Sequence, residues 1–520
     1  MSDEPPGRPW AVRIARVLLI ALVALPVARA AERPNVLMIA IDDLKPLLGC
    51  YGMPRVVSPH IDALAARGTV FLNAHCQQAV CGPSRASLLT GLRPDTTRVW
   101  DLKTQVRDNL PDVVTLPQHF KNNGYESVGI GKVFDPRSVD GRSTMDRVSW
   151  SRPYVRATSP SHDTFGYRNP ETVGRIEAGL AHTRAEGIDG WRETQAAIGH
   201  KPPTDSAVVA DDAYDDGAVA TAAVRLIEEL AAGDTPFFLA VGFKKPHLPF
   251  CAPRRYWDLY DADAFELASP ARLPDGAPSF HFQDSMELRG GYTGIPAGPL
   301  PDVLQRELIH GYHACVSYVD AQVGRLIAAL ADAGVAENTV VVLWGDHGWH
   351  LGDHGMWCKH TNYEQATRVP LVIVAPRQKR AGGRAKAPVE LIDIFPTLCE
   401  LTHLQLPPDL EGKSLAAALD DPTAAIKPAA VSQYPRQRPD GELMGYAFRT
   451  ERYRFIQWFP FDPASPNSTG GRQPVATELY DYETDPAEIH NLADDPGHRA
   501  AREEMVRLAE AYWRTRRSRP

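Results

Sequence analysis

A cysteine stands at the head of the segment with the clearest chemical potential in this sequence. Residues 81–91 read Cys-Gly-Pro-Ser-Arg-Ala-Ser-Leu-Leu-Thr-Gly, so Cys81 precedes a predicted short helix that carries Arg85 and ends at Gly91. The first turn of a helix has unpaired backbone N–H groups and a partial positive charge, and an anion held beside Cys81 would meet both. A lone cysteine in such a place is more often structural than catalytic, so the rest of the sequence has to decide between these interpretations.

Two pairs of potential metal ligands follow predicted strands. Asp42 and Asp43 come directly after one apolar run, and Asp346 and His347 follow another. In an α/β fold, ligands bind beyond the carboxyl ends of the strands, which would bring the two pairs to one place. Carboxylate oxygens favour a hard cation such as calcium, although one imidazole leaves manganese or zinc open. Asp42 and Asp43 alone would be interpreted as a solvated turn, but the two pairs together predict one bound divalent ion.

Four short, nearly continuous apolar runs predict the strands of a parallel sheet that is buried on both faces. The runs are 35–41, 237–243, 339–344 and 370–375. Helical stretches lie between them: Ser58 and Pro59 start one, and another has helical apolar spacing before Gly233. Strands that alternate with helices predict a doubly wound α/β domain.

The pattern changes after residue 428 and predicts a smaller α+β domain over 429–520. Its expected elements are a hairpin at 445–458, a strand at 478–482 and a closing amphipathic helix at 500–514. The larger domain would span 31–428. It contains two stretches of low periodicity, 140–210 and 260–302, which predict surface insertions that could line a cleft.

Residues 1–30 have the pattern of a cleaved export signal. Arginines precede the apolar run 17–27, which ends in Ala28-Arg29-Ala30. A membrane-spanning helix needs about 20 apolar residues, so this run is too short, and no stable membrane insertion is expected. The mature chain is expected in the periplasm, in the medium or in a lysosome-like compartment; an uncleaved anchor is the alternative.

The bulk composition is that of a globular protein, with 43% hydrophobic and 23% charged residues among 520. The formal net charge of -8 provides no general attraction for nucleic acid, so an anionic substrate would need locally placed cations. The seven cysteines are odd in number and widely spaced, which argues against a disulfide scaffold or a zinc ribbon and leaves their pairing open.

The Cys81 segment, taken whole, resembles the signature of the type I sulfatases. Further blocks at 35–51, 124–134, 236–250, 344–370 and 478–496 extend the resemblance over most of the chain, and it is strongest to the iduronate-2-sulfatases. The resemblance implies an alkaline-phosphatase-like fold with residues 31–428 as the sulfatase catalytic domain. It also implies that a cellular maturation machinery oxidises Cys81 to formylglycine.

Such a nucleophile has a chemical advantage for sulfate esters. A serine would be left as a sulfated ester that needs a second difficult displacement. In a hydrated aldehyde, one geminal hydroxyl attacks sulfur and expels the alcohol, and loss of the proton from the other lets the aldehyde re-form and release sulfate. Cations aimed at the sulfate oxygens offset the repulsion of the incoming hydroxyl.

The resemblance also assigns roles to individual residues. One calcium ion would be held by Asp42, Asp43, Asp346, His347 and an oxygen of modified Cys81. Arg85 would hold the formylglycine hydroxyl and the metal carboxylates, Lys132 and Lys359 would contact the sulfate, and His247 would lie beside the leaving group. Taken singly, each of these lysines would be interpreted as a solvated surface charge.

Asp135 is the one clear departure from the iduronate-2-sulfatase pattern, which has a histidine three residues after the lysine equivalent to Lys132. That histidine is expected to take the proton that triggers re-formation of the aldehyde. An aspartate could act as this base, although its negative charge near sulfate would oppose binding and attack.

Three more histidines, His350, His354 and His360, lie close to His347 in sequence and could suggest a zinc cluster. We interpret them as loop residues that support the site, because carboxylates already supply oxygen ligands.

The expected substrate is a sulfated saccharide with a 2-O-sulfated uronic acid, or a similar acidic sugar, at the end of a polysaccharide chain. Its carboxylate would need a cation, and Lys244, Lys245 or Arg436 could supply one; the two lysines could equally be solvated loop charges. Two alternatives remain: a phosphonate or phosphate ester hydrolase of the same superfamily, and a non-catalytic protein that binds sulfated glycans.

Overall fold

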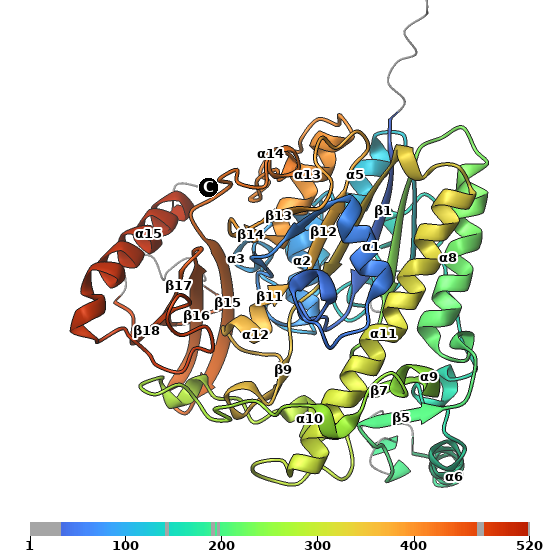
Figure 1. Cartoon of the computed structure of the whole chain (residues 1–520), viewed down its shortest axis with the longest axis horizontal. Helices are drawn as coiled ribbons and strands as arrows, with labels where there is room; N and C mark the ends of the chain where they lie inside the picture. The colour runs from blue at the N-terminus through green and yellow to red at the C-terminus, as the bar shows by residue number, and fades with distance from the viewer. Residues whose placement is uncertain (1–32, 141–144, 189–192, 195–197, 465–472, 518–520) are drawn as a thin grey trace, which may run out of the picture. The chain divides into compact units, whose positions relative to one another are not determined.

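The central sheet contains seven strands in the order β13-β2-β12-β8-β1-β6-β4. Figure 1 labels β13, β12 and β1 of this sheet. The computed structural model describes residues 33–140, 145–188, 193–194, 198–464 and 473–517, so the predicted export signal lies outside the described residues. Four neighbouring strands run parallel. Three of them were predicted from the apolar runs: β1 (Asn35–Ile41), β6 (Phe237–Phe243) and β8 (Thr339–Gly345). The fourth, β4 (Glu126–Gly131), was not predicted. The strands β2 (Thr69–Phe71), β12 (Leu371–Val374) and β13 (Gly383–Ala385) complete the sheet.

The sequence prediction is wrong for the apolar run 370–375, which was expected to be a parallel strand. The strand that it forms, β12, runs antiparallel to both β8 and β2. A parallel neighbour needs a crossover, normally a helix, that carries the chain back to the opposite edge of the sheet. The segment 346–370 between β8 and β12 contains no such crossover; its helix, α12 (Glu364–Thr367), has four residues. The chain therefore turns at the carboxyl edge and comes straight back.

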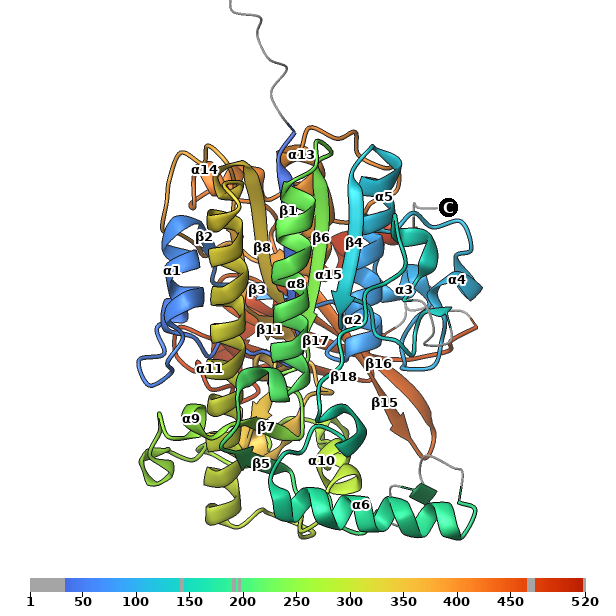
Figure 2. The same cartoon turned by 90° about the vertical axis from the view of Figure 1, so that its right-hand side faces the viewer.

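Alternate residues of β1 face two different helical layers, which accounts for its continuous apolar sequence. Leu37 and Ile39 pack into a core with α1 (Pro59–Arg67), α8 (Asp215–Ala231) and α11 (Asp302–Asp332). Val36 and Met38 pack into another with α2 (Cys81–Thr90), α5 (Leu116–Asn122) and α13 (Ile394–Leu401). Figure 2 shows α8 and α11 in front of the strands. This is the doubly wound α/β arrangement that was predicted.

Among the described helices, α11 alone is long and apolar enough to cross a membrane, judged by length and composition. Of its most apolar window, 67% is buried inside the protein. It packs against α1, α8 and the strand β7 (Phe250–Pro253) and serves as a core helix.

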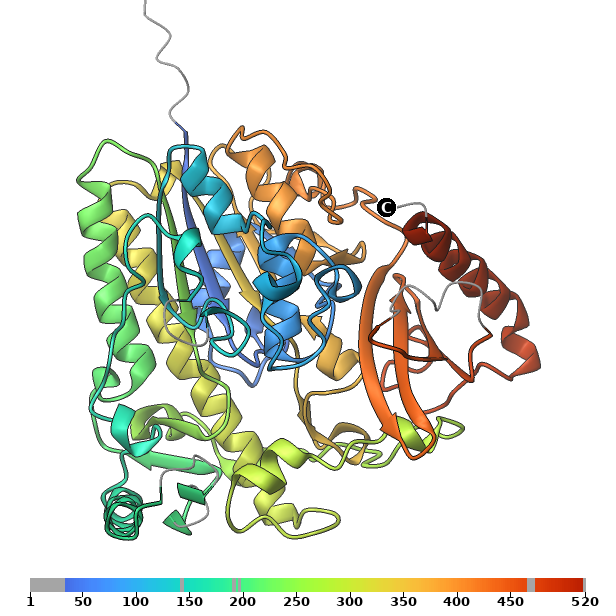
Figure 3. The same ribbon diagram turned by 180° about the vertical axis from the view of Figure 1, so that it is seen from behind.

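A second sheet follows residue 428 and contains the elements expected there (Figure 3). Its strands form an antiparallel meander: β15 (Ala430–Arg438), β16 (Gly441–Arg449), β17 (Tyr453–Pro460) and β18 (Ala476–Asp481). One face packs on α15 (Arg499–Arg517) through Trp513, and the other packs on Tyr363 of the larger part. The described residues from 33 to 517 form one compact unit, and the domain boundary at 428/429 stays a prediction.

The two low-periodicity insertions contain elements that the sequence did not indicate. The first contains α6 (Pro170–Ala185) and β5 (Thr204–Ala207), which pairs with β7. The second contains the six-residue helix α10 (Met286–Gly291), which contributes a carboxylate to the site described next. All seven cysteines are unpaired.

Candidate active site

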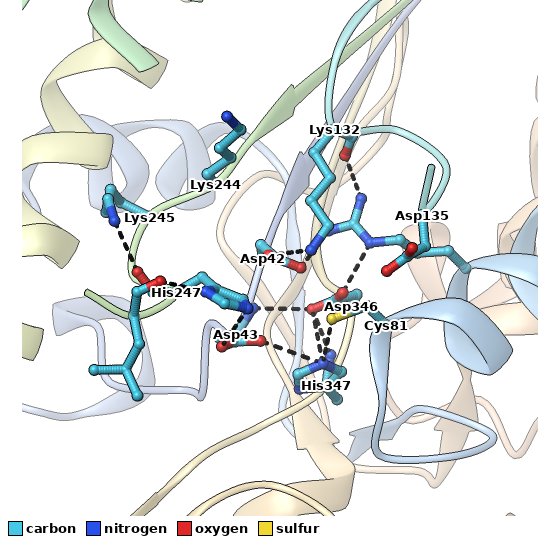
Figure 4. A network of polar contacts seen from close by, with 12 residues as sticks. Asp42, Asp43, Cys81, Lys132, Asp135, Lys244, Lys245, His247, Asp346 and His347 are labelled. Atoms are coloured by element: carbon cyan, nitrogen blue, oxygen red, sulfur yellow. Dashed lines mark hydrogen bonds and ion pairs between the residues drawn. The ribbon is translucent and has the colours of Figure 1, made fainter. Parts of the chain in front are cut away.

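The predicted metal ligands meet where β1 and β8 end side by side (Figure 4). Ile41 is paired with Gly345 in the parallel register, so the next residues of the two strands, Asp42 and Asp346, lie together. The backbone N–H of Asp43 donates to Asp346 Oδ1 at 3.0 Å. Asp43 is in the left-handed region, with φ of 61°, which turns its side chain into the same cluster.

These side chains fit a divalent cation. Asp42, Cys81, Asp346 and His347 form one group whose potential ligand atoms all lie within 4.8 Å of one another, and all four residues are buried. Asp43 Oδ1 is 3.3 Å from His347 Nε2. Burial raises the pKa of Asp43 to about 7 against the opposing charge of Lys359, so its ionised form lacks sufficient positive charge nearby. A bound cation would supply that charge.

The orientation of His347 also suits a ligand. Its Nδ1 lies 3.0 Å from the carbonyl oxygen of Gly348, which can only accept a hydrogen bond. A proton on Nδ1 would satisfy this acceptor and leave the lone pair of Nε2 directed toward the acidic cluster, where it could bind a cation. The same Nε2 lies 3.3 Å from Cys81 Sγ.

Cys81 is the first residue of α2, one position inside the helix that it was predicted to precede, and Gly91 ends this helix as predicted, in the left-handed conformation with φ of 71°. The thiol is buried, and burial together with Asp42 raises its pKa well above the usual range. An unmodified thiol in this state is a weak nucleophile, because the thiolate is the reactive form. Burial therefore keeps the thiol of Cys81 in its protonated form.

Arg85 lies one helical turn after Cys81 and joins the two strand ends. Its Nε donates to Asp346 Oδ2 at 2.8 Å, and its Nη2 donates to Asp42 Oδ1 at 3.0 Å. The guanidinium is fully buried, and its Nη1 donates to the carbonyl of Val133 at 2.9 Å. One fixed, permanently charged fork thus orients two of the potential metal carboxylates.

Two lysines and a histidine surround the same cluster. Lys132 Nζ lies 2.5 Å from Asp42 Oδ2, and Lys359 Nζ lies 3.0 Å from both carboxylate oxygens of Asp43. His247 Nε2 is 3.9 Å from Asp43 Oδ2. Burial and the charge of Lys359 lower the pKa of His247 to about 4. The three side chains assigned to sulfate and leaving group therefore lie around one centre.

Glu287, on α10, is a member of this site that sequence reasoning missed. Its Oε1 accepts from Lys359 Nζ at 2.9 Å and lies 3.3 Å from His247 Nε2. Burial alone would raise the pKa of Glu287, but the charges of Lys359 and His247 outweigh it and lower the pKa to about 2. The carboxylate is therefore ionised and fixes both groups. No motif marked it, because it lies in the low-periodicity insertion 260–302.

Asp135 lies beside the centre but is held by Arg137. Its Oδ1 accepts from the backbone N–H and the Nε of Arg137, each at 2.9 Å, and its Oδ2 accepts from Nη2 at 2.7 Å. Burial would raise the pKa of Asp135, but these hydrogen bonds and the charge of Lys132 outweigh it and lower the pKa to about 2. The carboxylate is thus a weak base, and Arg137 balances the charge that the sequence analysis identified as unfavourable.

The three additional histidines lie in supporting contacts. His350 Nε2 is 2.8 Å from Thr361 Oγ1, and His354 Nε2 is 3.3 Å from Glu488 Oε2. His360 Nε2 is 4.0 Å from Glu287 Oε2. Within the described part of the chain, none of them belongs to a group of potential metal ligands.

The three cations considered for a substrate carboxylate differ in their surroundings. Lys244 Nζ donates to Asp215 Oδ2 at 2.7 Å, and Lys245 Nζ donates to the carbonyl of His247 at 2.8 Å; neither points toward Cys81 in Figure 4. Arg436 is buried, its Nη2 donates to the carbonyl of His360 at 2.5 Å, and its Nε has no hydrogen-bond partner. Arg436 also forms no ion pair with a described carboxylate, so burial lowers its pKa.

The fold is alkaline-phosphatase-like. The chain belongs to the sulfatase family: the sulfatase family model matches residues 34–404, and the model for the C-terminal part of N-sulphoglucosamine sulphohydrolase matches residues 352–513. It is therefore a sulfatase, an enzyme that hydrolyses sulfate esters.

Its relatives include two iduronate 2-sulfatases. The Mus musculus enzyme is 34% identical, with 96% of this chain and 98% of that protein covered. The Homo sapiens enzyme is 35% identical, with coverages of 89% and 91%. These similarities confirm the resemblance inferred from the motifs.

Solved structures show the same fold at lower identity. A 2-O GAG sulfatase superimposes with a TM-score of 0.68 at 22% identity, covering 94% of this chain and 93% of that chain. A phosphonate monoester hydrolase from Silicibacter pomeroyi gives a TM-score of 0.69 at 23% identity, covering 92% and 95%. The predicted fold class is thereby confirmed.

Proposed function

We propose that this sulfatase is exported and removes sulfate from a 2-O-sulfated uronic acid at the end of a polysaccharide chain, using a formylglycine made from Cys81. The observation that carries the proposal is the placement of buried Cys81 at the first turn of α2, 3.3 Å from His347 and within a cluster of potential metal ligands. The names of the iduronate 2-sulfatase relatives support the choice of sugar.

The charges of the site support a bound divalent cation. When all groups are counted as ionised, five carboxylates face four side-chain cations: Asp42, Asp43, Asp135, Glu287 and Asp346 against Arg85, Lys132, Arg137 and Lys359. The centre then has one excess negative charge and repels a sulfate ester. Calcium bound by Asp42, Asp43, Asp346 and His347 would reverse that sign and polarise the sulfate oxygens.

The remaining roles follow from position. Lys132 and Lys359 would hold the sulfate oxygens from two sides, while Arg85 keeps Asp42 and Asp346 in place. The formylglycine hydrate would supply the attacking oxygen where the N–H groups of the first turn of α2 favour an anion. His247 Nε2 faces the same centre and would act at the oxygen of the departing alcohol.

Arg436 is the cation that we assign to the carboxylate of the sugar. Lys244 and Lys245 already have protein acceptors, whereas Arg436 has an unpartnered Nε and no carboxylate partner within the described residues. A buried guanidinium without a counter-ion gains most from an anionic ligand, and the Nε–H would donate to it, since Nη1 and Nη2 already donate to the carbonyls of Pro435, His281 and His360.

Sulfate release from three substrates tests the proposal: 2-O-sulfated iduronate, its uncharged hexose counterpart and an aryl sulfate. We expect wild-type enzyme to prefer the iduronate, with a preference that weakens as salt is added. Arg436→Gln should remove the preference, whereas Arg438→Gln, on the same strand and paired with Asp440, should keep it. Equal or better turnover of the uncharged sugar would reject the uronate, and matched aryl phosphates would report any phosphatase activity.

The nucleophile and the export have separate tests. Cys81→Ala and Cys81→Ser should fold but lose nearly all sulfate release; wild-type turnover by the alanine variant would refute the mechanism. The N-terminal sequence of protein recovered outside the producing cytoplasm should begin near residue 31, and an intact N-terminus on exported enzyme would contradict cleavage near Ala30.

A further inference from the structure

We propose that a pocket beside the catalytic centre binds the second sugar residue of the substrate; this inference rests on the proposed function. The pocket has a volume of about 720 Å³, within the range of small-ligand sites. Val80 and His360 both line it. Val80 precedes Cys81 and His360 follows Lys359 in the sequence, so the pocket adjoins the groups assigned to the nucleophile and the sulfate.

Half-buried aromatic rings form one part of the lining. The rings of Trp100 and Phe461 meet edge to face with centroids 5.1 Å apart. The indole N–H of Trp100 donates to Asp95 Oδ1 at 3.1 Å, which fixes the ring before any ligand arrives. Tyr434 adds a third ring, 5.8 Å from that of His360. Rigid rings of this kind offer apolar area to the C–H face of a pyranose at little cost in conformational entropy.

Two basic and two acidic side chains also line the pocket. Arg98 and Lys103 are exposed, and neither forms an ion pair with a described carboxylate. Asp101 uses its Oδ1 to accept the backbone N–H groups of Lys103 and Thr104, each at 2.8 Å, and so orders the loop. Glu442 is the other acid in the lining.

This composition indicates the class of sugar. Two cations balanced by two carboxylates do not favour a densely charged group, but they provide donors and acceptors for hydroxyls. We therefore assign the pocket to a pyranose with at most one anionic substituent. The terminal 2-O-sulfated uronate would occupy the catalytic centre, and the residue linked to it would lie against Trp100.

Competition against an aryl sulfate tests the pocket directly. The two competitors are the methyl glycoside of 2-O-sulfated uronate and a disaccharide in which the same uronate is linked to a hexosamine. We expect the disaccharide to compete about tenfold better with wild-type enzyme, an increment of the size expected for one additional sugar contact. Because the readout is a ratio of inhibition constants, a general loss of activity cancels.

Three variants locate the effect. Trp100→Ala should bring the ratio close to one, and the double variant Arg98→Gln/Lys103→Gln should lower it severalfold without touching a buried group. Lys386→Gln, an exposed lysine outside this pocket, should leave the ratio unchanged. Thermal unfolding of each variant reports whether it is folded.

The outcomes separate the pocket from the proposed function. Two results would overturn the pocket assignment while the uronate assignment stands. One is a wild-type ratio of one when the monosaccharide does compete. The other is an unchanged ratio in both Trp100→Ala and the double variant Arg98→Gln/Lys103→Gln. If the aryl sulfate is hydrolysed but neither sugar competes, both assignments fail.

Discussion

The carboxylate of Glu287 lies 3.3 Å from Nε2 of His247, while Nδ1 of the same ring lies 2.6 Å from the carbonyl oxygen of Leu248. Both ring nitrogens therefore face acceptors. Acceptors at both nitrogens fix the ring plane and favour the doubly protonated ring, and the charge of Glu287 acts in that direction against the burial and the charge of Lys359 that lower the pKa of His247. Glu287 is thus a positioning residue for His247 and, through its 2.9 Å contact, for Lys359.

Glu287→Gln should separate this role from a purely structural one. We expect kcat/KM for a sugar sulfate to fall about tenfold or more, within the range of lost acid–base assistance. The value of kcat/KM for an aryl sulfate with a good leaving group should fall less, because its departing oxygen needs little protonation. Glu266→Gln, an exposed acid in the same insertion, is the matched control. Equal losses on both substrates would contradict the assignment.

Asp135→Asn tests whether Asp135 is the base that re-forms the aldehyde. Since Arg137 donates to both carboxylate oxygens, we expect the turnover of Asp135→Asn to fall by less than about tenfold. Stopped-flow assays should show no burst of alcohol. If Asp135 is the base instead, sulfate release becomes the slow step, and a burst followed by a slow steady state will appear.

The Asp135–Arg137 pair should also appear in acid stability. The folded pKa of about 2 lies below the ordinary 3.8, so the pair stabilises the fold above about pH 4 and loses this contribution as the pH falls toward 2. The contribution should be on the order of 2 kcal/mol near neutral pH. Urea unfolding at several pH values measures the free energy of unfolding of wild type and of Asp135→Asn, and the difference between the two should shrink to zero as the pH falls from about 4 toward 2.

Asp275→Asn, in an exposed pair, is the control. A difference between wild type and Asp135→Asn that does not change with pH would contradict the prediction.

Removal of metal should abolish activity and lower the melting temperature, because a cation that binds only the folded state stabilises it. Calcium should restore both in wild type. In Asp42→Asn, calcium should give little increase in melting temperature, a readout that does not depend on activity. Full activity of a demonstrably metal-free preparation would refute the metal site.

The sequence predicted those parts of the site that follow regular strands and helices. Asp42 and Asp346 could be placed together because each ends a continuous apolar run, and parallel strands share a carboxyl edge. Lys132, Lys359 and His247 came from resemblance, since an isolated lysine or histidine gives no signal of its own.

The remaining features depend on the path of irregular chain. Glu287 reaches Lys359 from an insertion without periodicity, and its role depends on where that insertion folds back. The antiparallel direction of β12 depends on the connection after β8 and not on its own apolar residues, which suit either direction. The hydrogen bonds from Arg137 to both carboxylate oxygens of Asp135 depend on the local turn, which residue types alone did not reveal.

The central claim is that Cys81 becomes the nucleophile by oxidation, and the mass of the peptide that contains residue 81, taken from active enzyme, tests it most directly. The account predicts that the side chain has lost its sulfur and two hydrogens and gained one oxygen, in proportion to the activity of the preparation. Fully active enzyme whose Cys81 retains an unmodified thiol would contradict it.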